Sequence, residues 1–131
     1  IVGLIQTGLG FPVEEQAWVL RLLADRRALT ALLPFLVVLM PLAEEVMFRG
    51  YLFRFLSQRS WPAAAYVVSA AVFSMVHWNA SGTVQYFVVG LVFAAVCHVT
   101  RTLTAAAVAH ATYNGLVILI ALVGGAAAPP S

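Results

Sequence analysis

The chain has 131 residues, of which 63% are hydrophobic and 9% are charged, whereas a soluble domain of this length carries about 25% charged residues. This composition excludes an ordinary soluble domain and indicates an integral membrane protein. The net charge of +2 comes from scattered arginines, which form no nucleic-acid-binding patch, and the single cysteine, Cys97, excludes an internal disulfide and a cysteine-based metal cluster.

The first element that we predict is an amphipathic helix over residues 12–27. Three of its polar residues fall on one face: Glu14, Arg21 and Asp25. The opposite face is apolar, so we expect the helix to lie in the membrane interface. Acidic residues in its first turn, together with Arg26 and Arg27 in its last turn, complement the helix dipole.

Four apolar segments follow, each near the roughly 20 residues that a bilayer-spanning helix needs. Their expected bounds are 30–57, 61–78, 83–100 and 102–123. We expect Pro34 and Pro41 to kink the first segment and to free backbone carbonyl groups just before Glu44. The predicted fold class is therefore all-α, a polytopic membrane bundle of four transmembrane helices with an N-terminal interfacial helix. We divide the chain into an N-terminal segment (1–29), a membrane core (30–125) and a disordered tail (126–131).

Two adjacent acidic residues, Glu44 and Glu45, interrupt the first apolar segment. A charged side chain at the middle of a membrane costs at least about 2.5 to 3.5 kcal/mol, so each carboxylate needs a partner or a purpose. Arg49 lies one helical turn beyond Glu45 on the same face, and we interpret these two as a structural ion pair. Glu44 is rotated by about 100° and lacks this partner, which suits a general acid or base. The alternative is that the three residues form a purely structural ion cluster.

Later segments carry further polar side chains at helical spacing. His110 and Asn114 are four residues apart and share one helix face, as do Phe73 and His77. At a rise of about 1.5 Å per residue, Glu44, His77, His110 and Asn114 lie about 12 to 24 Å deep in the membrane, counted from the side on which the first segment ends. Helix tilt can bring side chains at these depths to one level. Hydrogen-bonded packing is the simpler interpretation of each His alone, but the set together favours one site. His98 lies near a helix end and is left out of it.

A carboxylate, two imidazoles and an amide permit two mechanisms of peptide hydrolysis. In the first, Glu44 and His77 deprotonate a water molecule, while His110 and Asn114 donate hydrogen bonds to the oxyanion. In the second, Glu44, His77 and His110 bind zinc, which activates the water.

Three motifs occur in chain order: Glu44-Glu45-x-x-x-Arg49, Phe73-x-x-x-His77 and His110-x-x-x-Asn114. Over about residues 30–125 the chain thereby resembles the CAAX prenyl protease type II and bacteriocin-processing family, also called CPBP or Abi, which has the motifs EExxxR, FxxxH and HxxxN. The resemblance implies an intramembrane endopeptidase in which Glu44 and His77 activate water while His110 and Asn114 hold the oxyanion. The family has been described both as metalloproteases and as metal-independent glutamic proteases. We favour no cofactor, because Asn is a poor zinc ligand, and keep zinc as the alternative.

The resemblance also implies that residues 30–125 are a catalytic core in a multi-pass protein of a prokaryotic cell membrane. We expect the lipid bilayer and a membrane-associated or prenylated peptide or protein as partners. Three other functions remain open. A proton-coupled transporter also buries Glu, Arg and His, although we find no internal repeat. A bis-His haem protein would leave the glutamates unexplained, and a family member can be a non-catalytic immunity or scaffold protein.

Overall fold

The computed structural model describes residues 25–59, 61–80 and 82–123, and within these ranges it contains helices and no strand. This confirms the all-α prediction. In chain order the elements are α3 (Arg26–Pro34), η2 (Phe35–Leu39), α4 (Met40–Glu45), η3 (Val46–Phe53), α5 (Arg54–Ser57), α6 (Pro62–Val76), α7 (Thr83–Thr100) and α8 (Leu103–Val123), where η denotes a π-helical segment. The predicted interfacial helix lies almost entirely outside the described residues, as does the predicted tail.

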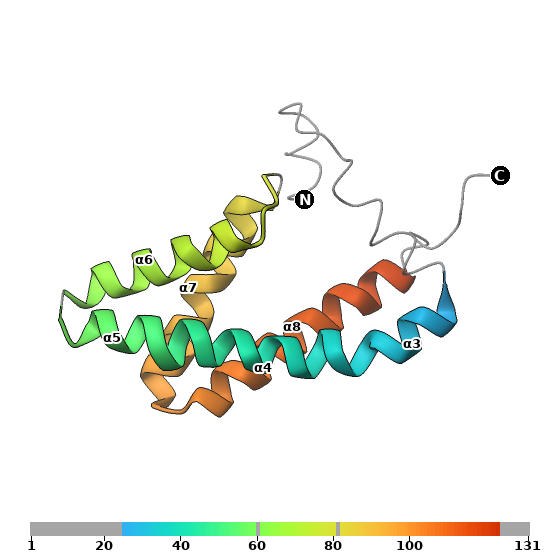
Figure 1. Cartoon of the computed structure of the whole chain (residues 1–131), viewed down its shortest axis with the longest axis horizontal. Coiled ribbons are helices and arrows are strands. Elements are labelled where there is room, and N and C mark those ends of the chain that lie inside the picture. The colour runs from blue at the N-terminus through green and yellow to red at the C-terminus, as the bar shows by residue number, and fades with distance from the viewer. Residues whose placement is uncertain (1–24, 60, 81, 124–131) are drawn as a thin grey trace.

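Elements α3 to α5 join end to end into one rod of 32 residues, which crosses the whole of Figure 1. The rod begins at Arg26 because the Asp25 carboxylate accepts hydrogen bonds from the backbone N–H groups of Arg27 (3.0 Å) and Ala28 (3.1 Å). The predicted start at residue 30 was therefore wrong. Arg26 and Arg27 are the first residues of this rod and not, as predicted, the last residues of the interfacial helix. Positive charges are unfavourable at a helix N-terminus, and the hydrogen bonds to Asp25 outweigh this cost.

Both prolines of the first apolar segment lie where the helical pitch changes. Pro34 is the last residue of α3, and Pro41 lies in the first turn of α4. Between them the Met40 N–H donates to the Phe35 carbonyl, five residues back, as in a π-helix. Segments of this kind are rare and are frequently found at functional sites. Here two of them flank α4, the short helix that carries Glu44 and Glu45.

Three of the described helices are long and apolar enough to cross a membrane: Arg26–Ser57, Thr83–Thr100 and Leu103–Val123. The second of the four predicted spanning helices, over residues 61–78, is the shorter α6, and its 15 residues extend only about 22 Å at 1.5 Å each. It ends early because Trp78 adopts a positive φ of 48°, a conformation that helices exclude. His77 consequently lies at a helix end and not within a helix.

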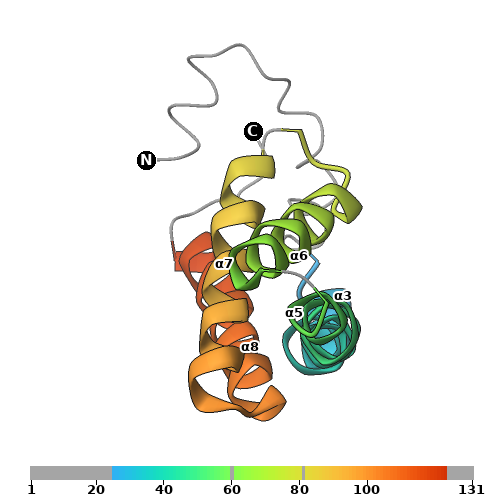
Figure 2. The same ribbon diagram turned by 90° about the vertical axis from the view of Figure 1, so that its left-hand side faces the viewer.

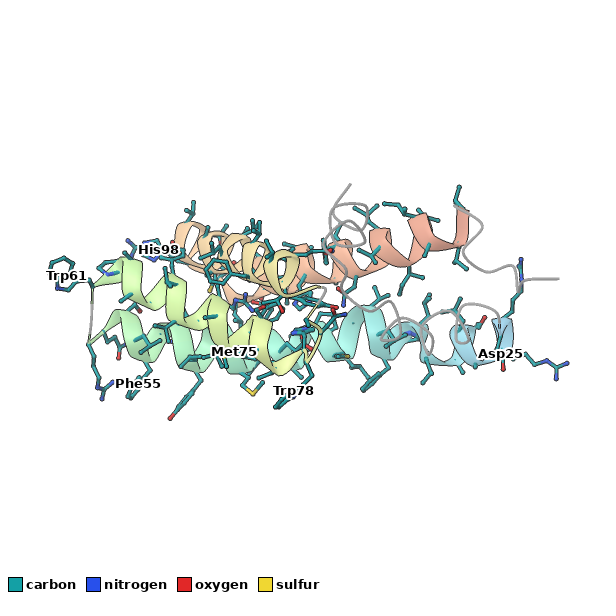
Figure 3. The ribbon with its side chains drawn as sticks, turned by 90° about the horizontal axis from the view of Figure 1, so that it is seen from above. Asp25, Phe55, Trp61, Met75, Trp78 and His98 are labelled. Carbon is teal, nitrogen blue, oxygen red and sulfur yellow. The ribbon has the colours of Figure 1, made fainter. Side chains whose placement is uncertain are left out.

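Figure 2 looks along the rod and shows α6, α7 and α8 gathered beside it. Helix α6 packs on α5, η3 and α7, and α8 packs on α7, α4 and η2. Small residues permit this close packing, since Ala65, Ala70 and Ala94 are completely buried. The outer surface remains apolar, and Phe55, Met75 and Trp78 project outward on one side in Figure 3. The helices therefore form a membrane bundle with an apolar outer surface, which buries Glu45, Arg49 and His110 inside.

Candidate functional site

The interior of the bundle contains the predicted ion pair between Glu45 and Arg49. Arg49 Nη1 lies 2.9 Å from Glu45 Oε1, and both side chains are fully buried. Arg49 Nη2 also donates to the Gly90 carbonyl of α7 at 2.8 Å. Because both terminal nitrogens are used in this way, Arg49 ties the rod to α7. We call Glu45, Arg49 and Gly90 the charged core.

Aromatic rings surround the Arg49 guanidinium on several sides. Its central carbon lies 4.6 Å from the ring centre of Phe73, 5.5 Å from that of Phe93 and 5.8 Å from that of Phe48. These distances are typical of cation–π interactions, and such interactions partly compensate for the loss of water around a buried cation. Phe73, predicted as a supporting residue, therefore contacts the charged core directly.

His110 connects the two glutamates. Its Nδ1 lies 2.9 Å from Glu45 Oε1 and its Nε2 lies 3.6 Å from Glu44 Oε2. Because Glu45 Oε1 also accepts from Arg49, Glu45 is the acceptor and His110 Nδ1 carries a proton. The His110 ring stacks on Phe93 with 4.4 Å between ring centres, which holds Nε2 towards Glu44. The contact between His110 and Glu45 was not foreseen from the sequence.

His77 is held at the junction of α6 and α7. Its Nδ1 lies 2.7 Å from the Phe73 carbonyl, and since a carbonyl only accepts, Nδ1 donates, which in the neutral imidazole leaves a lone pair on Nε2. The ring stacks on Tyr86 at 4.1 Å and lies 4.6 Å from the Phe73 ring. The four-residue spacing of Phe73 and His77 thus fixes the imidazole by a carbonyl and by a ring, in the tautomer that a general base requires.

Glu44 lies near both imidazoles, since its Oε2 is 3.6 Å from His110 Nε2 and the charge of His77 also acts on it. Its side chain is 16% exposed, whereas that of Glu45 is completely buried. The ion-pair contact of Glu44 in the described part of the chain is to His110, and none joins it directly to His77. Glu44 is therefore the carboxylate of the pair that is not neutralised by an arginine contact.

Asn114 lies one turn beyond His110 on α8, and its Nδ2 donates to the Leu36 carbonyl at 3.1 Å. Both side chains thus face the rod, as their spacing predicts. His110 reaches the glutamates of α4, while Asn114 reaches the backbone of η2.

The zinc alternative requires at least three ligands that converge on one point. Within the described ranges, no three His, Cys, Asp or Glu side chains are grouped so as to hold a metal ion. Glu44, His77 and His110 do not form such a group. As they lie in the described structure, these side chains do not converge on one metal position, and the chemistry proposed below uses no zinc.

Other residues contribute to the site without having been predicted: Gly90, Phe93, Tyr86, Gln85 and Tyr113. Gln85 of α7 donates to the Tyr113 hydroxyl of α8, next to Phe93. A glycine inside an apolar helix often marks a close helix contact, so Gly90 carried a readable signal. The aromatic residues carried none, because they are typical of any apolar helix.

Comparison with known proteins gives two matches. A family model described as type II CAAX prenyl endopeptidase Rce1-like matches residues 26–116, which include every predicted site residue. The UPF0177 protein YbdI of Lactococcus lactis subsp. lactis (strain IL1403) is 27% identical over 89 residues, covering 67% of this chain and 48% of YbdI. The chain thus spans about half the length of this curated relative. No solved structure matches it.

Proposed function

The chain belongs to the type II CAAX prenyl endopeptidase Rce1-like family, and from that premise we propose that it hydrolyses peptide bonds in the membrane with a water activated by Glu44 and His77. One observation carries this proposal. His110 bridges the glutamates, with Nδ1 at 2.9 Å from Glu45 and Nε2 at 3.6 Å from Glu44, and only Glu45 is paired with Arg49. Two neighbouring carboxylates thereby acquire different tasks.

Glu44 and His77 are the groups that accept hydrogen bonds from the water, and Glu44 is the one that takes its proton. Glu44 has no arginine contact, and His77 presents an Nε2 lone pair because its Nδ1 donates to the Phe73 carbonyl. A water held between them has an acceptor for each hydrogen, and its oxygen lone pair is left for the peptide carbonyl. The absence of a direct ion pair between the two side chains is compatible with one intervening water.

His110 and Asn114 complete the mechanism as donors to the oxyanion. Attack by water breaks the carbonyl π bond and leaves a negative oxygen, while the water proton passes to Glu44. The proton then moves from Glu44 to His110 Nε2, which lies 3.6 Å from Glu44 Oε2. The resulting imidazolium lies between two carboxylates, and its Nε2–H donates a hydrogen bond to the oxyanion. When the C–N bond breaks, this proton leaves with the amine. The second N–H of Asn114 is the further donor.

The substrate that we propose is a membrane-associated or prenylated peptide or protein. The site lies inside a bundle with an apolar outer surface, so a substrate anchored in the bilayer reaches it without leaving the lipid. The haem alternative is disfavoured because both nitrogens of His110 face carboxylates. A non-catalytic role is tested by the same assay as the enzymatic one.

The experiment compares the parent with Glu44→Gln in lipid nanodiscs, using a fluorogenic peptide with and without a prenyl group. Loss of the base should lower turnover by about a hundred- to ten-thousandfold. The melting temperature should stay unchanged, since Glu44 contacts no arginine. Thr112→Ala is the control, because Thr112 is exposed and bonds only within α8, to the Val108 carbonyl at 2.8 Å. Parent-like turnover of Glu44→Gln would exclude Glu44 as the base.

A further inference from the structure

The Leu36 carbonyl lies at a break in the backbone hydrogen bonding of the rod. In an α-helix its donor would be the N–H of Met40, but that group donates to the Phe35 carbonyl. In a π-helix its donor would be the N–H of residue 41, which is Pro41 and has none. Neither regular helical partner is therefore available to Leu36.

The side chain of Asn114 supplies the missing donor from another helix. Its Nδ2 lies 3.1 Å from the Leu36 oxygen, and α8 packs on both η2 and α4. The next residue, Gly115, faces the same segment, since a Cβ there would lie 3.8 Å from Val37 Cγ1. In Figure 1, α8 accordingly extends towards the α3 end of the rod. Such a donor matters in a membrane, because no bulk water satisfies a backbone carbonyl there.

We propose that Asn114 is a positioning residue that replaces the backbone N–H missing at Pro41 and thereby fixes the junction of η2 and α4. Glu44 follows Pro41 by less than one helical turn, so the angle at which α4 leaves this junction sets the direction of its carboxylate. This role is additional to donation to the oxyanion, because the amide has two N–H groups and one is bound to the protein. The hydrogen bond from Asn114 to Leu36 does not depend on the proposed function, whereas the importance of the Glu44 orientation for turnover rests on that function.

The proposal predicts that Asn114 and Pro41 are energetically coupled. Pro41→Ala restores a backbone N–H that can donate to the Leu36 carbonyl, so the rod should no longer need the hydrogen bond from Asn114. The experiment is a double-mutant cycle of the parent, Asn114→Ala, Pro41→Ala and the double variant, with Thr112→Ala as the control on α8. Melting temperature, hydrogen exchange of residues 40–45 and turnover are measured for each.

We expect Asn114→Ala to lower the melting temperature and to speed exchange in α4 by more than tenfold. In the Pro41→Ala background the same substitution should change neither, and turnover should recover at least tenfold relative to Asn114→Ala. Asn114→Leu should resemble Asn114→Ala, because neither side chain has an N–H to donate. If Asn114→Ala does not fold, the double variant is expected to fold.

Equal losses from Asn114→Ala in both backgrounds would overturn the proposal, as would a double variant that also fails to fold. Coupling in stability without recovery of turnover would overturn the positioning of Glu44. If the parent itself cleaves no peptide, the proposed function fails, and melting and exchange still decide the role of Asn114 in the rod.

Discussion

Glu44 and Glu45 are adjacent in the chain, yet they occupy two different environments. Glu45 is completely buried, bonds Arg49 and His110, and belongs to the charged core. Glu44 is partly exposed and faces the imidazole of His110 without an arginine contact. A rotation of about 100° between successive residues of a helix produces this difference. One carboxylate can thus hold the bundle together while its neighbour remains available for chemistry.

The largest effect on stability should come from removing the charge of Glu45. Glu45→Gln leaves the buried Arg49 without its counter-charge, at a cost of about 3 to 5 kcal/mol for one partner of a buried pair. Unfolding by heat in detergent measures this loss. The double variant Glu45→Gln/Arg49→Met should regain much of the lost stability, since it leaves no unpaired buried charge. A Glu45→Gln protein as stable as the parent would erase the distinction between the two glutamates.

A smaller effect is expected where α7 approaches the charged core. A Cβ on Gly90 would lie 3.2 Å from Ala70 Cα, Ala70 Cβ and Phe73 Cδ1, so Gly90→Ala must push α6 and α7 apart. We expect a loss of about 1 to 3 kcal/mol, because such overpacking strains the backbone, together with a weaker bond from Arg49. Unfolding in detergent again measures it.

Gly115→Ala is the matched control, since its Cβ would meet Val37 at an ordinary 3.8 Å. It should be neutral, or stabilising by up to about 1 kcal/mol through higher helix propensity. Equal destabilisation by the two substitutions would show that Gly90 has no special role next to Arg49.

No effect at all is expected from metal removal. Because the donor groups do not converge on one point, prolonged treatment with a strong chelator should leave peptidase turnover unchanged. Elemental analysis of active protein should give well under one metal ion per chain. Zinc occupancy that follows activity across preparations, and that falls in both His77→Ala and His110→Ala, would contradict this.

The features that depend on local geometry were predictable from the sequence. The Glu45–Arg49 pair forms because residues four apart meet on any helix, and the apolar segments gave the helices nearly in full. The helix start at Arg26 was missed because Asp25 was assigned to a preceding helix and not to a cap. Helix α6 was predicted, but its end was placed two residues too late, because that end follows from the positive φ of Trp78.

The motifs predicted that Glu44, His77, His110 and Asn114 share one site, but the individual contacts between distant residues were beyond such prediction. His110 meets Glu45 across 65 positions, and Asn114 meets Leu36 across 78, so both contacts depend on how α8 packs on the rod. The prolines indicated freed carbonyls before Glu44, but not which carbonyl or which donor. The roles of Glu44, His77, His110 and Asn114 in catalysis stay predictions that rest on the motifs and on this geometry.

The most direct test of a water activated by Glu44 is a single turnover in water enriched in oxygen-18, followed by mass spectrometry of the product and of the peptide that contains Glu44. If Glu44 acts as a base, the attacking oxygen comes from solvent. The account predicts one labelled oxygen in the new carboxylate of the product and none in Glu44. An unlabelled product from the first turnover, with label in Glu44 after several turnovers, would show instead that Glu44 attacks the peptide carbonyl itself.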